Sequence, residues 1–211
     1  MHKTRQNYQK FTAGALAVLA ALGLLIRVII ASGQFGSVWS GVSHLYQFFT
    51  ITTNSLVLVV MILLFREREV HRNVILATAA SIAGVGIIFH TLLGAPAGQQ
   101  GWDLLANLIT HTFVPIAMVL WWLVYTDYSQ VRWTDTWYCL PWPGAYCAYA
   151  LLRAEYSGFY PYHFIDLEQL GWVGLGKSVF GLSLAFLFLG LLLVSYAKMH
   201  HRITRKALPA T

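Results

Sequence analysis

Two side chains capable of acyl transfer lie within long apolar stretches, where polar groups are costly and are by default candidates for function. Thr50 is near the start of the stretch 46–65, and His111 lies inside the stretch 104–125. A hydroxyl and an imidazole are the minimum for nucleophilic acyl transfer, because the imidazole removes the hydroxyl proton and the oxygen then attacks a carbonyl. We predict that Thr50 is a nucleophile and His111 its general base, provided that the two stretches pack together.

Further polar side chains fall at the same depth when consecutive stretches cross a bilayer in alternating directions. These side chains are Arg27, Thr53, Asn54, His90, Asn107 and His163. We expect them to support substrate binding or catalysis at the outer leaflet. Asn107 lies one helical turn from His111 and can orient it. Thr53 or Asn54 can supply an oxyanion donor. Arg27 or His163 can hold a substrate carboxylate.

Each of these residues also has a purely structural interpretation. A threonine in a membrane helix often bonds the carbonyl four residues earlier, and an intramembrane histidine can join helices by hydrogen bonding. The Arg27 side chain can extend to the outer headgroups, and Asn54 and Asn107 can hold helices together. Only the shared depth of these residues favours a site.

Pro115 lies four residues after His111 and cannot donate a hydrogen bond to the carbonyl of residue 111. The helix is therefore expected to loosen or kink beside His111. Such a distortion next to a polar residue can open a cavity.

Other chemistries have weaker support. His90, His111 and His163 could together bind zinc or haem, but no carboxylate or thiolate completes a convincing ligand set. The Gly-x-Ser-x-Gly, His-Glu-x-x-His and phosphate-loop motifs are absent. We expect no metal and no cofactor.

The elements that position these residues are predicted from composition. Hydrophobic residues make up 57% of the 211 residues and charged residues 10%, and mean hydropathy is +0.59. Soluble domains carry about 25% charged residues, so the chain is expected to be an all-α, polytopic membrane bundle forming a single domain over 1–211. Six stretches have the length of a span: 11–32, 46–65, 73–93, 104–125, 137–152 and 172–197. The prolines at 141 and 143 can move the start of the fifth to about Pro143.

The basic residues predict an orientation. Eleven of the fourteen lie at the two chain ends and in the loops 66–72 and 126–136, which an even number of spans places on one side. The positive-inside rule puts that side, with both termini, in the cytoplasm. The net charge of +6 is thus explained by topology, and we expect no nucleic-acid partner. The first stretch is too long for a cleavable signal peptide.

Three short blocks resemble a known family. Phe48-Phe49-Thr50, Ile109-Thr110-His111-Thr112-Phe113-Val114-Pro115 and Gly158-Phe159-Tyr160-Pro161 are similar to blocks of the androgen-induced protein family, in its bacterial branch. That family of six-span membrane proteins includes the androgen-dependent regulators of tissue factor pathway inhibitor. The resemblance covers nearly the whole chain in architecture but only these blocks in sequence.

The resemblance implies a threonine hydrolase. Animal members cleave fatty acid esters of hydroxy fatty acids with a threonine nucleophile and a histidine base, which match Thr50 and His111 by position. Thr53 and Asn54 stand where some animal members have an acid, so the substrate can differ. The expected protein is an intramembrane lipid esterase of the inner membrane, with its site toward the outer leaflet. The alternatives are a transporter, a lipid- or haem-binding protein, or a structural membrane protein; the oligomeric state is left open.

Overall fold

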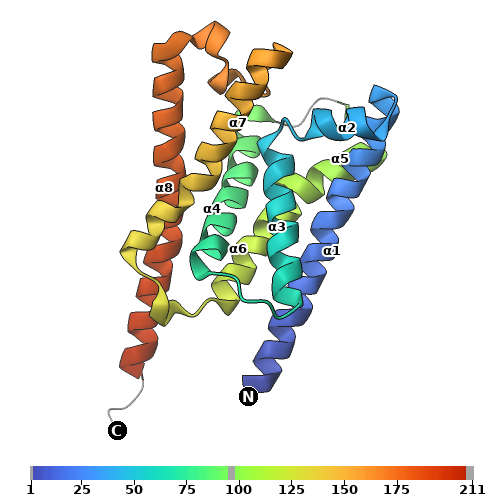
Figure 1. Ribbon diagram of the computed structural model, residues 1–211. Helices are drawn as coiled ribbons and strands as arrows, with labels where there is room; N and C mark the ends of the chain where they lie inside the picture. Colours follow the sequence, from blue (N-terminus) through green and yellow to red (C-terminus); the bar gives the residue numbers. More distant parts are fainter. Residues whose placement is uncertain (1, 95–97, 208–211) are drawn as a thin grey trace.

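The computed structural model describes residues 2–94 and 98–207, and this part of the chain is a bundle of helices (Figure 1). The longer helices are α1 (His2–Phe35), α3 (Phe49–Phe65), α4 (Arg72–Ile88), α6 (Val114–Tyr125), α7 (Pro141–Ser157) and α8 (Leu167–Ala207). The shorter elements are α2 (Val38–Leu45), α5 (Gly101–Leu108), the π-helical η1 (Phe89–Leu93) and η2 (Ile109–Phe113), and the 3₁₀ segments η3 (Tyr128–Gln130), η4 (Trp133–Cys139) and η5 (His163–Ile165). The expected all-α fold is confirmed over the described residues.

Several helices have the length and composition of membrane spans. Among the described residues these are four, at 3–35, 72–93, 101–125 and 167–204, or up to five if the pair α2 and α3, bent by 98°, is one span. Large apolar side chains on the outer surface of α1 and α8 fit a lipid environment, since Val18, Ile29, Phe180 and Phe188 are 58–69% exposed. A membrane protein is thus indicated.

The helices in the regions of the fifth and sixth expected spans have bounds that differ from those of the expected spans. The fifth span, expected at 137–152, corresponds to α7 at 141–157, because Pro141 occupies the first helical turn and residues 133–139 form the 3₁₀ segment η4. The sixth, expected at 172–197, corresponds to α8, which runs from 167 to 207 across a kink at Gly171 (φ 62°, ψ 173°). Glycine adopts that positive φ without steric cost.

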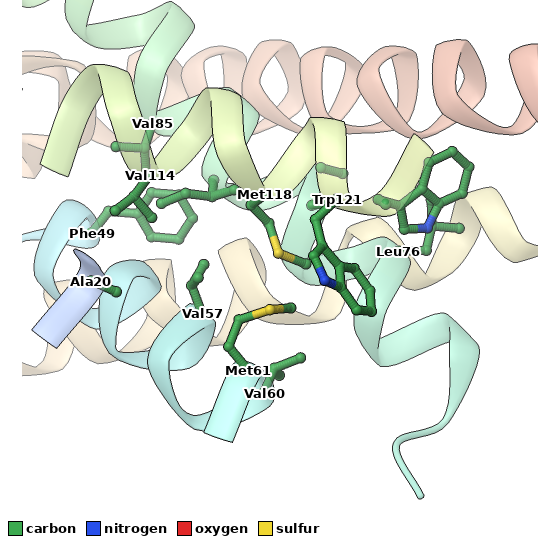
Figure 2. Packing of buried hydrophobic residues seen from close by; sticks show 14 of the residues in the cluster. Ala20, Phe49, Val57, Val60, Met61, Leu76, Val85, Val114, Met118 and Trp121 are labelled. Atoms are coloured by element: carbon green, nitrogen blue, oxygen red, sulfur yellow. The ribbon is translucent and has the colours of Figure 1, made fainter. Parts of the chain in front are cut away.

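The interior is filled where α1, α3, α4 and α6 meet. Figure 2 shows Met61 of α3 and Met118 of α6 in this core, with Trp121 at one end and Phe49 at the other. Met61 and Met118 are fully buried, and Trp121 is 6% exposed. The flexible thioethers fill irregular gaps between the helices. This packing fixes α3 against α6, whose N-terminal extension carries His111.

The start of α1 and the end of α8 lie at the same end of the bundle (Figure 1). Lys10 forms an ion pair with Glu67 in the loop between α3 and α4, at 2.5 Å. Arg5 donates to the carbonyl of Val124 near the end of α6. Arg72 lies 3.6 Å from the Asp135 carboxylate. The N-terminal segment and the basic loops 66–72 and 126–136 therefore share one end, as the charge pattern predicted.

Candidate active site

Thr50 occupies the first turn of α3, just after the sharp bend from α2. Phe48 is the N-cap in an extended conformation (φ −94°, ψ 134°), so Thr50 is the second helical residue. Residues 46–48 are not helical, and no turn of α-helix precedes Thr50 to offer its hydroxyl a carbonyl, unlike Thr78 or Thr110. Its Oγ1 instead lies 3.2 Å from His111 Nε2. The expected contact between the two stretches is present.

His111 lies in the centre of the π segment η2. The carbonyl of Ile109 accepts from the N–H of Val114, five residues on, and Pro115 has no N–H to offer the carbonyl of His111. Gly86 of α4 allows a close approach here, since a Cβ at that position would lie 3.2 Å from the His111 carbonyl oxygen and from Pro115. The loosening expected from Pro115 thus takes the form of a π turn, a distortion frequent at functional sites.

The hydrogen bonds of the imidazole assign its tautomer. His111 Nδ1 lies 3.2 Å from the carbonyl oxygen of Asn107. Because a carbonyl only accepts, Nδ1 carries the proton and donates. In the neutral ring Nε2 is then an acceptor, so the Thr50 hydroxyl donates its proton toward Nε2. This is the ground-state arrangement of a nucleophile and its general base.

Aromatic packing holds the imidazole from its face. Phe89, the first residue of η1, stacks on His111 with ring centroids 3.9 Å apart and an interplanar angle of 23°. The two π segments therefore meet at one depth and position the ring together. Asn107 orients His111 through its backbone carbonyl, where its side chain was expected to do so; its side-chain amide donates to Gln99 Oε1 at 2.7 Å.

Two cavities of different character meet at Thr50. An apolar cavity of about 180 Å³ lies between α3, α4, α7 and α8, with walls that include Val85, Ile88, Leu182 and Phe186. A polar cavity of about 500 Å³ lies beside α1, α2, α5 and η2, with Arg27, His44, Gln99, Asp103 and His111 in its lining. Thr50, Leu93 and Tyr162 line both cavities. A carbonyl at this junction could extend an acyl chain into one cavity and a polar group into the other.

An ion pair supplies the charge of the polar cavity. Arg27 Nη1 lies 2.6 Å from Asp103 Oδ1, and the two side chains are 18% and 37% exposed. Arg27 therefore lies in the lining of this cavity, paired with Asp103. Since this contact uses one of its five N–H donors, the guanidinium retains capacity for an anionic ligand.

The other expected supporting residues have separate roles. Thr53 faces α7, where its hydroxyl accepts from the Trp142 indole N–H at 3.1 Å. Asn54 is fully buried and donates to the carbonyls of Thr50 and Thr110, joining α3 to η2. His90 is exposed and lies 3.0 Å from Thr112 Oγ1. His163 is exposed beside Phe164, outside both cavities as far as the described residues define them.

Sequence reasoning missed Tyr162. This residue of the aromatic outer loop is 9% exposed and accepts a hydrogen bond from the Phe49 N–H at 3.0 Å. Burial raises the pKa of Tyr162, and the hydrogen bond from the Phe49 N–H acts in the opposite direction. The signal available in the sequence was the run of aromatic residues from Tyr156 to Phe164, which indicated a loop folded over the bundle without distinguishing its members.

Comparisons of the chain with protein-family models, curated proteins and solved structures find no match. The chemistry open to the site is therefore inferred from its geometry. A threonine hydroxyl bonded to a correctly oriented neutral imidazole, at the junction of an apolar and a charged cavity, has the elements needed for transfer of an acyl group from a lipid ester.

Proposed function

We propose that this protein is an intramembrane hydrolase of fatty acyl esters that spans the inner membrane six times, with both termini in the cytoplasm. Thr50 is its nucleophile and His111 its general base. The observation on which this rests is the 3.2 Å contact between Thr50 Oγ1 and His111 Nε2 at the junction of the two cavities. The resemblance of the blocks around Thr50 and His111 to the androgen-induced protein family supports the same reaction.

The reaction follows from the hydrogen bonds. His111 Nε2 takes the Thr50 hydroxyl proton as Oγ1 attacks the ester carbonyl carbon, and the carbonyl electron pair moves onto its oxygen. When this oxyanion collapses, the bond to the leaving alcohol breaks and Nε2 returns the proton to that alcohol. Water then adds to the acyl-threonine with His111 as base, and Thr50 Oγ1 leaves with the proton as the fatty acid is released.

The two cavities favour an ester with two unlike ends. The apolar cavity is suited to an acyl chain, since its side-chain lining is almost wholly aliphatic or aromatic. The polar cavity offers Arg27 to a carboxylate on the alcohol portion. A fatty acid ester of a hydroxy fatty acid combines both groups in one molecule. The outer-leaflet depth of the site allows lateral entry of such a lipid from the bilayer.

The first test is covalent labelling of purified protein in detergent by a long-chain fluorophosphonate. We expect a wild-type adduct that maps to Thr50, because the hydroxyl is already bonded to its base. Thr50→Ala and His111→Ala are each expected to lower the labelling rate by about 100-fold or more. Mass spectrometry of the labelled peptide identifies the modified residue.

Thr52→Ala is the matched control, because the Thr52 hydroxyl donates to the Phe49 carbonyl at 3.0 Å and not to His111. All variants are compared at equal monodispersity on size exclusion. Labelling that persists in Thr50→Ala would reject Thr50 as the nucleophile. A wild type that neither labels nor hydrolyses long-chain esters would reject the hydrolase and favour a transporter or a lipid- or haem-binding protein, the latter recognisable by a Soret band.

A further inference from the structure

The junction of the two cavities contains a second polar side chain besides the nucleophile. Of the three residues that line both cavities, Leu93 has an aliphatic side chain, and Thr50 is the attacking group. The remaining one is Tyr162, whose phenolic oxygen is held at the start of α3 by the N–H of Phe49, the residue before Thr50. The phenol is therefore placed beside the oxygen that attacks.

The environment keeps this phenol a donor. Its ring stacks on Phe164 with centroids 5.0 Å apart and packs edge-on against Phe48 at 6.2 Å. Burial raises the pKa of Tyr162, so its hydroxyl remains protonated at neutral pH. An O–H whose oxygen already accepts a hydrogen bond is a stronger donor, since linked hydrogen bonds polarise one another.

We propose that Tyr162 is a catalytic residue that donates a hydrogen bond from its hydroxyl to the oxyanion formed when Thr50 attacks the ester carbonyl. This inference rests on the proposed function. The oxyanion forms next to Thr50, near the N-terminus of α3, where the helix dipole also favours negative charge. No covalent bond of Tyr162 breaks. Its O–H donates a hydrogen bond to the oxygen as the carbonyl electron pair moves onto it, and this hydrogen bond weakens when the carbonyl reforms.

Two other residues expected to supply this donor are already committed elsewhere. Thr53 faces Trp142 of α7, and the Asn54 amide N–H groups go to the carbonyls of Thr50 and Thr110. Tyr162 lies at the same junction as the reacting hydroxyl and reaches it from a different segment, the outer loop. The loop thus closes the site over the first turn of α3.

The test is Tyr162→Phe, which keeps the ring and removes the hydroxyl. We expect the turnover of a long-chain ester to fall by about 100-fold, as for loss of one oxyanion donor, with KM changed by less than about threefold. Tyr156→Phe is the matched control: Tyr156 belongs to the same aromatic run, but it is 91% exposed and lines neither cavity.

A second measurement separates catalysis from support of the fold. A trifluoromethyl ketone with a long acyl chain forms a tetrahedral adduct with an oxyanion, whereas the corresponding ether has no carbonyl. Tyr162→Phe is expected to weaken binding of the ketone by about 100-fold and to leave binding of the ether unchanged, since only the ketone adduct resembles the transition state. Equal weakening of both ligands would mean that Tyr162 only supports the structure.

A third variant covers the case in which Tyr162→Phe does not fold. Replacement of Tyr162 by trifluorotyrosine keeps the hydroxyl but makes it more acidic, so activity should fall at a lower pH than in wild type as the donor ionises. An unchanged pH profile, or an active wild type with Tyr162→Phe as fast as Tyr156→Phe, would overturn the role of Tyr162 while the hydrolase proposal stands. An inactive wild type would overturn both.

Discussion

At the scale of single residues, the polar groups within the apolar stretches differ by what they touch. Asn54 joins backbone carbonyls of two elements, Thr53 receives an indole N–H, and Thr78 returns its hydroxyl to the carbonyl of Val74. Thr50 and Arg27 instead face cavities. Depth in the membrane therefore does not separate the residues that face a cavity from those whose polar atoms join helices.

Arg27 gives a prediction at this scale. Arg27→Gln removes the cation from the polar cavity, so KM for an ester with a free carboxylate should rise by about 10-fold or more, the effect of a lost charged hydrogen bond. KM for the methylated, neutral form of the same ester should change by less than about threefold. Steady-state hydrolysis of the two esters measures the difference.

Arg153→Gln is the control for that experiment. Arg153 also lies near the outer end but donates to the carbonyl and hydroxyl of Ser43. It should change KM for both esters equally. If Arg27→Gln also affects both esters equally, Arg27 does not bind the carboxylate, and its contribution is limited to the ion pair with Asp103.

At the scale of elements, the site depends on two departures from the α-helix. The π segments η1 and η2 bring Phe89 and His111 face to face, and the bend before α3 leaves Thr50 in a first turn. These distortions accompany the contact between Thr50 and His111 on which the proposed function rests.

Gly86 tests this dependence. Gly86→Val places a branched side chain against the His111 carbonyl and Pro115, so η2 must shift. Because misplacement of a reacting group by about 1 Å can cost about 100-fold in rate, we expect fluorophosphonate labelling of Thr50 to slow by about 10-fold or more. Labelling rate and thermal unfolding are measured on the same preparation.

Gly181→Val is the matched control, since Gly181 is also helical but a Cβ there meets nothing within 4 Å. It introduces the same β-branched residue without pressing on the site. If Gly86→Val labels as fast as Gly181→Val, the close approach of α4 to η2 does not position His111.

At the scale of the whole molecule, the bundle separates a basic end from an end that closes over the site. At the basic end, Lys10 pairs with Glu67 and Arg72 lies near Asp135. The aromatic outer loop packs at the opposite end. The topology proposed from the positive-inside rule would put the site toward the outer leaflet. A substrate would reach Thr50 from the bilayer or from outside the cell.

Cysteine accessibility tests the orientation. In a background with Cys139 and Cys147 replaced by alanine, Glu155→Cys should react with an impermeant maleimide on intact cells. Glu69→Cys, an equally exposed glutamate in the loop before α4, should react only after lysis, because it lies at the basic end. The reverse pattern would invert the proposed topology, and reaction of both on intact cells would contradict their placement on opposite sides.

Much of the architecture was predictable because hydropathy and charge act locally along the chain. The long apolar stretches, the shared end of the basic loops and the distortion near Pro115 each follow from residues within one segment. The helices α7 and α8 begin at other residues than the spans expected there, since helix ends depend on capping and on single residues such as Gly171, which composition does not describe.

By itself, the sequence determined that the protein is an all-α bundle with apolar helices and that polar groups gather at one depth, because burial in lipid selects composition and the spacing of polar residues sets their depth. Only the tertiary structure decided which of those groups meet. The Thr50–His111 contact joins residues 61 positions apart. His111 is oriented by the backbone carbonyl of Asn107 and not by the Asn107 side chain. Tyr162 contacts the start of α3 from a loop. Such contacts depend on helix packing, π-turn register and loop closure, which arise from interactions between segments distant in the chain.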